Sequence, residues 1–181
     1  MRIIGGEWGG RRINPPPKMP YTRPTTDIAR EGLFNVIQNN LELESCETLD
    51  LFGGTGSISY ELASRGAKAL TIVEKDNAMF EFIKKTSASL GMQNARLVKM
   101  DVFRFLETTP DKYDFIFAGP PYALPNIDDL PKIIFRQDLL REGGWFVLEH
   151  TPRNDYKLFE GYRTERKYGT TIFSIFVNKH G

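Results

Sequence analysis

The segment "DLFGGTGS" (residues 50–57) joins a predicted strand to a predicted helix through a glycine-rich loop. The apolar run at 48–52 predicts a buried strand, and the stretch at 57–66 predicts a helix that ends at a glycine. Glycines in such a loop let the main chain approach a ligand closely, and the helix behind it offers free N–H groups. The sequence therefore predicts a ligand site here, against the simpler alternative of a tight turn that binds nothing.

The alternation of strands and helices continues after this unit. Apolar runs predict further strands, which we place at residues 69–74, 95–100, 113–118 and 144–150. Helices are expected between them, which we place at residues 76–91 and 101–107, with a broken helix at 127–140. Two β-like runs flank Gly169 near the end of the chain. This order is typical of an α/β protein with a mainly parallel, doubly wound sheet and an antiparallel edge.

The N-terminal part has a different character. Glycine pairs within residues 1–14 predict a small hairpin, and the proline-rich stretch 14–20 predicts a stiff, extended linker. A helix is expected to begin near Thr25 or Thr26, with one of them as the N-cap. Its apolar face is expected to hold Ile28, Leu33, Val36, Ile37 and Leu41. We therefore expect an N-terminal extension (residues 1–20) followed by the main domain (residues 21–181).

Composition excludes several classes of protein. The chain has 181 residues, of which 40% are hydrophobic and 26% charged, as in ordinary globular proteins. No apolar run approaches the roughly 20 residues that span a membrane, and the first residues lack the apolar core of a signal peptide. We therefore expect a cytoplasmic protein. A single cysteine, Cys46, permits no internal disulfide and no zinc thiolate cluster, so we expect a core residue and no metal.

Charge is distributed unevenly along the chain. The net charge is +1, but the first 30 residues carry +4 and the remaining residues carry −3. A basic arm on a nearly neutral body is typical of a protein with a polyanionic partner, although a solvated flexible terminus explains the charge alone equally well. The basic residues of this arm are Arg2, Arg11, Arg12, Lys18, Arg23 and Arg30.

Acidic residues stand at the ends of three successive predicted strands. These are Asp50, Glu74 and Asp101. Glu74 is placed to accept hydrogen bonds from ribose hydroxyls, and Asp101 from an adenine amine. Each acid alone is more often a helix cap or a solvated strand end. A dinucleotide fingerprint fails at Ser59, and the Gly-Lys-Ser/Thr ending of a P-loop is missing. Together the acids favour a nucleoside with an amino-acid tail.

A second motif follows the strand predicted at 113–118. The strand ends in Gly119-Pro120-Pro121-Tyr122, and two prolines can neither continue a sheet ladder nor open a hydrogen-bonded helix turn. The result is a rigid corner with an aromatic side chain at its tip.

These motifs resemble, in order, those of Rossmann-like S-adenosylmethionine-dependent methyltransferases. Four more segments, "MRIIGGEWGGRRI", "RPTTDIAREGLFNVI", "ELASRGA" and "FVLEH", resemble the bacterial 16S ribosomal RNA guanine-N2 methyltransferase family of the RsmD type. The resemblance implies a seven-stranded, mostly parallel sheet with the last strand antiparallel, helices on both faces and a small N-terminal hairpin. It also implies a ribosomal RNA substrate, within a small-subunit ribonucleoprotein particle.

The resemblance implies roles for particular residues. The expected contacts to S-adenosylmethionine come from Asp50, Phe52, Gly53, Gly54, Thr55, Gly56, Glu74, Lys75, Asp101 and Val102. The six basic residues of the arm are expected to bind RNA, and Tyr21, Arg23 and Thr25 to flank the pocket. The corner, Gly119 to Tyr122, is expected to be catalytic: the Pro120 carbonyl accepts a hydrogen of the base amine and Tyr122 stacks on the base.

Gly119 departs from the family pattern, which has Asp or Asn at this position. Loss of that side-chain acceptor is expected to cost about 2–4 kcal/mol of transition-state stabilisation. Asp114 lies too far from the corner to replace it, whereas Asp128 or Asp129 could swing in. Three explanations stay open: impaired transfer, a replaced acceptor, or a change introduced into this sequence.

Two other functions stay open at this point. One is methylation of a base amine in DNA or another RNA, although a separate DNA-recognition domain has no room in 181 residues. The other is a noncatalytic protein that binds the cofactor and RNA. His150, which follows Glu149 at a strand end, is expected to be structural, and the terminal His180 to have no role.

Overall fold

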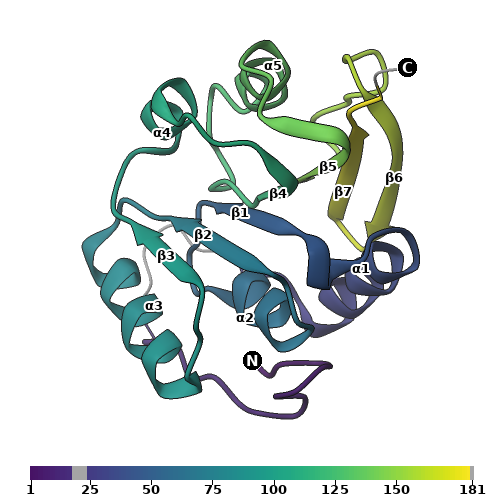
Figure 1. Ribbon diagram of the computed structural model, residues 1–181. Coiled ribbons are helices and arrows are strands. Elements are labelled where there is room, and N and C mark those ends of the chain that lie inside the picture. Colours follow the sequence, from purple (N-terminus) through teal and green to yellow (C-terminus); the bar gives the residue numbers. More distant parts are fainter. Residues whose placement is uncertain (18–23, 180–181) are drawn as a thin grey trace.

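In residues 1–17 and 24–179, which the computed structural model describes, seven strands form one sheet in the order β3-β2-β1-β4-β5-β7-β6 (Figure 1). The strands are β1 (Glu47–Leu51), β2 (Ala69–Val73), β3 (Ala95–Val98), β4 (Tyr113–Ala118), β5 (Leu140–His150), β6 (Tyr162–Tyr168) and β7 (Thr171–Val177). The helices are α1 (Asp27–Asn40), α2 (Ser57–Ser64), α3 (Asn77–Leu90), α4 (Val102–Thr108) and α5 (Asp129–Arg136), with a short 3-10 turn, η1 (Leu43–Ser45).

The sheet is mostly parallel. β1 pairs in parallel with β2 and β4, β2 with β3, and β4 with β5. The last strand, β7, is antiparallel to both β5 and β6. The predicted α/β, Rossmann-like architecture with its last strand antiparallel is therefore confirmed.

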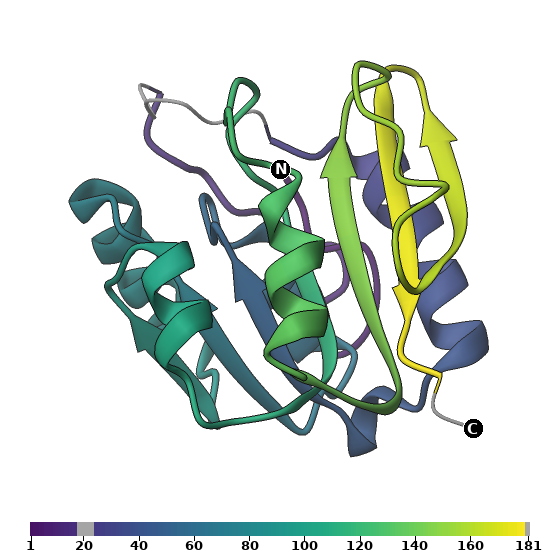
Figure 2. The same cartoon turned by 90° about the horizontal axis from the view of Figure 1, so that it is seen from above.

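Helices cover both faces of the sheet. Figure 1 shows α4 and α5 on one side and α1, α2 and α3 on the other, and Figure 2 shows α4 and α5 in front of the sheet with α1 behind it. Alternate residues of each strand point to opposite faces. In β4, for example, Phe115 and Phe117 pack with α1 and α2, whereas Ile116 and Ala118 pack with α4 and α5. Most core side chains therefore lie in two clusters, one on each face.

Helix α1 begins as the sequence predicts. The Thr26 side chain accepts a hydrogen bond from the N–H of Ala29 and caps the helix. The buried face differs from the expected one at Ile28, which is 75% exposed. The buried face holds Ala29, Arg30, Leu33, Phe34 and Ile37. Residues three or four positions apart share a helix face, so Ala29 and Arg30 lie with Leu33, whereas Ile28 is five positions before it.

The N-terminal segment forms the small hairpin that its glycine pairs predict. A bridge joins Arg2 to Arg12, and the N–H of Ile3 donates to the carbonyl of Arg11. Its apolar side chains, Ile3 and Ile13, pack against Tyr60 of α2 and Leu90 of α3. The hairpin thus lies against the body of the protein, beside these two helices (Figure 1). The predicted linker is described only up to residue 17.

One buried carboxylate fastens this hairpin to the body. Glu61 of α2 accepts hydrogen bonds from the N–H groups of Ile4 and Gly5, both at 2.9 Å. The same carboxylate lies 3.4 Å from Nε of Arg30 and 2.8 Å from Nε of Arg65. The Glu61 side chain therefore connects the hairpin, α1 and α2.

Arg30 is part of this connection and not of an exposed basic surface. Its side chain is 1% exposed, its guanidinium lies 2.9 Å from Oδ1 of Asp27, and it donates to the carbonyl of Arg2. The prediction that Arg30 contacts RNA phosphates is wrong for this conformation, because the charge is enclosed and already paired. A sequence cannot show this, since the partner Glu61 is 31 positions away along the chain.

The structure also bears on the predictions for Cys46 and for membrane-spanning segments. The Cys46 thiol is buried in the core, as predicted, and burial raises its pKa to about 11. Among the described residues, the helices are all too short or too polar to cross a bilayer.

Removal of the Glu61 carboxylate should destabilise the fold strongly. We expect Glu61→Ala to lower the free energy of unfolding by about 3–5 kcal/mol, because the buried Arg30 loses its buried carboxylate partner and keeps the partly exposed Asp27. The N–H groups of Ile4 and Gly5 also lose their acceptor. Urea denaturation measures the loss. Glu81→Ala on the exposed face of α3 is the matched control and should change stability little. A loss for Glu61→Ala no larger than that of the control would contradict this role.

Candidate active site

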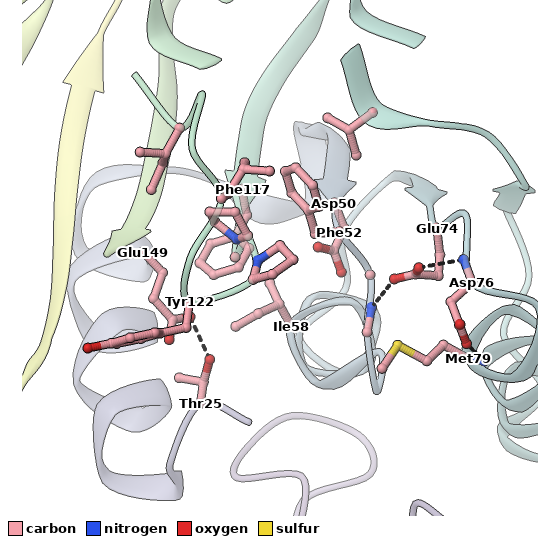
Figure 3. Close-up of a pocket in the computed structure, with 18 of the residues that line it drawn as sticks. Thr25, Asp50, Phe52, Ile58, Glu74, Asp76, Met79, Phe117, Tyr122 and Glu149 are labelled. Atoms are coloured by element: carbon pink, nitrogen blue, oxygen red, sulfur yellow. Dashed lines mark hydrogen bonds between the residues drawn. The ribbon is translucent and has the colours of Figure 1, made fainter. Parts of the chain in front are cut away.

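The carboxyl ends of the central parallel strands open into one cavity of about 1040 Å³. Its walls include the loops that follow β1, β2, β3 and β4, the end of β5, and Thr25 just before α1. This is near the upper end of the roughly 300–1,000 Å³ of small-molecule sites. Figure 3 shows Glu74 and Met79 on one side of the cavity and Tyr122, Thr25 and Glu149 on the other.

The glycine loop after β1 has a strained backbone. Phe52 has a φ of 60°, in the left-handed region that only glycine adopts easily. A side chain at Gly53 would place its Cβ 2.8 Å from Cγ2 of Ile72, so only glycine fits against β2 there. Gly56 has a φ of 84° and begins α2. The loop therefore keeps its main chain close to the cavity, as the sequence predicts.

Glu74, at the end of β2, holds this loop in place. Its carboxylate accepts hydrogen bonds from the N–H groups of Gly54 and Asp76, both at 2.8 Å (Figure 3). Its side chain is buried and borders the cavity. A carboxylate has about four acceptor sites, so two remain for hydroxyl groups of a ligand.

Asp50, at the end of β1, is nearly fully buried and borders the same cavity. Burial raises its pKa to about 7, the hydroxyl of Ser59 opposes this rise, and the charge of Glu74 adds to it. The Ser59 hydroxyl donates to Oδ2 of Asp50 at 2.6 Å. Ser59 is the residue that breaks the dinucleotide fingerprint, and here it supports the buried acid.

Asp101 caps helix α4, which is the alternative role that the sequence also allowed. Its side chain accepts from the N–H of Arg104 at 3.2 Å and begins α4. It is half exposed, lies 3.9 Å from Nζ of Lys75, and borders the cavity beside the buried Val102. All of the residues expected at the cofactor border this cavity except Gly56, which is the N-cap of α2.

The four residues of the Pro-Pro corner line the opposite part of the cavity. The N–H of Gly119 donates to the carbonyl of Leu51 at 3.4 Å, which ties the corner to the end of β1. The carbonyl of Pro121 accepts from the N–H of Leu124 at 3.1 Å and closes a turn. Tyr122 is 61% exposed, so its flat ring forms part of the rim of the cavity.

Two of the carboxylates considered as replacements for the missing acceptor, Asp114 and Asp128, are engaged elsewhere. Asp114 accepts from the N–H of Glu47 and from Arg141, both at 2.8 Å, at the far end of β4. Asp128 accepts from the hydroxyl of Tyr156 at 2.8 Å. Within the described part of the chain, the lining of the cavity does not include Asp128 or Asp129.

Sequence reasoning missed Glu149. This residue stands at the end of β5, borders the cavity, and accepts a hydrogen bond from the Thr25 hydroxyl at 2.7 Å (Figure 3). The signal was present, because an acid at the end of a predicted strand is the pattern that selected Asp50 and Glu74. Applied to the strand at 144–150, the same rule finds Glu149.

His150 is structural, as expected. Its Nε2 lies 2.6 Å from Oγ of Ser174, and its Nδ1 lies 2.8 Å from the carbonyl of Thr151. Its side chain is buried, and burial lowers its pKa. The ring also packs edge-on against Tyr156.

The remaining basic residues of the arm lie on the surface or outside the described residues. Arg11 and Arg12 are exposed, and Arg2 is half exposed beside Asp27. Lys18, Tyr21 and Arg23 lie outside the described residues, so their expected roles stay predictions.

Comparison with solved structures agrees with this architecture. A hypothetical protein of Thermus thermophilus superposes with a TM-score of 0.85 at 27% identity, over 97% of this chain and 98% of that one. The 16S rRNA N2 G1207 methyltransferase RsmC of T. thermophilus, solved with AdoMet and guanosine, gives a TM-score of 0.68 at 23% identity. That match covers 86% of this chain and 44% of RsmC, and it shows a common fold.

Sequence comparison is more specific. Residues 1–177 match the family described as Conserved hypothetical protein 95. Over 149 residues the chain is 35% identical to ribosomal RNA small subunit methyltransferase D of Escherichia coli K12, which covers 82% of this chain and 71% of that protein. The chain therefore belongs to the Conserved hypothetical protein 95 family, together with ribosomal RNA small subunit methyltransferase D.

Proposed function

We propose that this protein transfers a methyl group from S-adenosylmethionine to the exocyclic N2 amine of a guanine in 16S ribosomal RNA. One observation carries the proposal: the glycine loop with Glu74 and the Pro-Pro-Tyr corner line opposite parts of one cavity. A cofactor on the first part and a flat base on the second would lie side by side. RsmC, which shares the fold, has been solved with both kinds of ligand.

The first part of the cavity fits the cofactor. Glu74 keeps acceptor capacity for the ribose hydroxyls, and the half-exposed Asp101 can accept from an adenine amine beside the apolar Val102. The amino-acid end then lies toward the glycine loop and Asp50. When bound, S-adenosylmethionine supplies an electrophilic methyl group on a sulfonium sulfur.

The second part of the cavity fits a base turned out of its stack. The exposed ring of Tyr122 offers a stacking face, and the carbonyl of Pro120 accepts one hydrogen of the amine. Because both prolines fix their backbone, the corner needs no reorganisation when the amine begins to react.

RNA recognition is assigned to the exposed side chains of Arg2, Arg11 and Arg12, and to Lys18 and Arg23 as predictions. Contacts of this kind with phosphates make affinity fall steeply with salt. We place the reaction in the cytoplasm, on RNA within a small-subunit ribonucleoprotein particle. The name of the relative ribosomal RNA small subunit methyltransferase D supports the ribosomal RNA substrate.

The direct test is methylation of small subunits that lack this modification. With methyl-labelled S-adenosylmethionine, we expect label in 16S RNA, and nuclease digestion should release it as N2-methylguanosine. Duplex DNA serves as the competing substrate. Equal labelling of DNA would favour a DNA base-amine methyltransferase, whereas cofactor and RNA binding without any label would identify a noncatalytic protein.

Glu74 should be essential for cofactor affinity. We expect Glu74→Ala to weaken S-adenosylmethionine binding at least ~10-fold, because ribose loses a charged acceptor and the loop loses its anchor to Gly54. Isothermal titration calorimetry measures the change, with Glu81→Ala as the control on an exposed helix face. Unchanged affinity in Glu74→Ala would contradict the placement of the ribose.

Asp50 should give cofactor binding a pH signature. Its pKa is about 7 in the free protein, so near pH 6 it is mostly protonated. The cationic amino group of the cofactor lowers this pKa, so binding should release a proton and tighten as pH rises toward 7. Calorimetry in buffers of different ionisation enthalpy counts that proton. Asp50→Asn should lose this part of the release, and an unchanged proton count would contradict the assignment.

A further inference from the structure

The register of β4 and β5 places Gly119 and Glu149 opposite each other. Ala118 pairs with Leu148 in the parallel ladder, so the residues that follow this pair are Gly119, directly after β4, and Glu149 on β5. Side chains alternate between the two faces of the sheet. The Gly119 position therefore faces the same side as Phe117, and Glu149 the same side as Val147. This is the side of α1, where Thr25 lies.

The Glu149 carboxylate lies beside the place that a side chain at 119 would occupy. A Cβ built on Gly119 would be 3.5 Å from Oε1 of Glu149 and 3.1 Å from Cε2 of Phe117. An Asp or Asn at this position would carry its side-chain oxygen two bonds beyond that Cβ. Oε1 of Glu149 thus occupies nearly the same region of the cavity.

We propose that Glu149 supplies the side-chain acceptor for the reacting amine that the Gly119 corner lacks. The acceptor has moved from the end of β4 to the end of the neighbouring strand, and the absence of a side chain at Gly119 leaves room for it. This role rests on the proposed function, because it requires an amine-bearing base against Tyr122.

Thr25 holds the carboxylate in position. Its hydroxyl donates to Oε1 of Glu149 at 2.7 Å, and Thr25 itself is buried just before the cap of α1. This bond fixes the position of the carboxylate at the border of the cavity. Figure 3 shows Thr25, Glu149 and Tyr122 grouped on the same side of the cavity.

Methyl transfer to the amine needs only this carboxylate, the Pro120 carbonyl and the cofactor. Glu149 and the Pro120 carbonyl each accept one N–H of the amine, which directs its lone pair toward the methyl carbon. Bound S-adenosylmethionine would supply the methyl group: the lone pair would form the N–C bond, and the electron pair of the C–S bond would stay on sulfur and leave a neutral thioether. The amine nitrogen then carries the positive charge, and its proton passes to the Glu149 carboxylate and on to water.

The pair Gly119 and Glu149 should respond to substitution as a unit. We expect Glu149→Gln to lower kcat about 10²–10³-fold, because the charged acceptor is lost while S-adenosylmethionine affinity stays within about 2-fold. Gly119→Asp alone should not raise activity, since it puts a second carboxylate against Glu149 and crowds Phe117. The double variant Gly119→Asp with Glu149→Gln should regain at least ~10-fold over Glu149→Gln.

A binding measurement separates this role from a general loss of structure. With S-adenosylhomocysteine bound, Glu149→Gln should weaken guanosine binding about 10-fold or more, because its neutral amide is a poorer acceptor. Glu142→Gln is the matched control, since this exposed glutamate lies near the other end of β5. Guanosine affinity and kcat should both stay near those of the wild type in the control.

The outcomes distinguish this inference from the proposed function. Wild-type activity together with a Glu149→Gln variant as active as Glu142→Gln would overturn the role of Glu149 and leave the function intact. A gain of activity in Gly119→Asp with Glu149 present would also overturn the role of Glu149. It would show that no other group had supplied the acceptor in place of a side chain at position 119. A wild type that methylates no guanine would overturn both.

Discussion

The parallel pairing of β1, β2, β4 and β5 is the constraint on which the site depends. Because these strands run in the same direction, their carboxyl ends meet at one edge, and every residue that leaves a strand there borders the same cavity. The register then decides which side chains meet. A shift of one residue between β4 and β5 would turn Glu149 to the opposite face and separate it from the Gly119 position.

A second connection lies behind the site, in the enclosed charges of Glu61 and Arg30. They join the hairpin, α1 and α2, and so fix the start of α1, next to which Thr25 contacts Glu149. Three of the segments that carry the resemblance, residues 1–13, 23–37 and 61–67, contain the groups that make this connection, among them Arg30, Glu61 and Arg65. Their charges therefore serve assembly of the fold as well as any contact with RNA.

Much of the fold could be predicted because the apolar runs and glycine stops are local signals. Residues 113–118 form β4 with the predicted bounds. β5 was harder: it begins at Leu140, four positions before the predicted 144, where the carbonyl of Leu140 accepts from the distant Asn178. The prediction that Arg30 binds RNA was wrong for the same reason, since the burial of Arg30 depends on Glu61, a partner remote in sequence. The position of Glu149 beside Gly119 follows from the register of β4 and β5, which is not a local signal in the sequence.

The proposed function and the role of Glu149 together require that one cavity holds the cofactor and an amine-bearing base side by side, with Glu149 facing the amine. A crystal structure with S-adenosylhomocysteine and guanosine tests this most directly. We predict ribose hydroxyls on Glu74, the guanine ring on Tyr122, and its N2 at about 3 Å from both the Pro120 carbonyl and a Glu149 oxygen. A guanine bound in the cavity with N2 directed away from Glu149, or a base bound outside the cavity, would contradict the account.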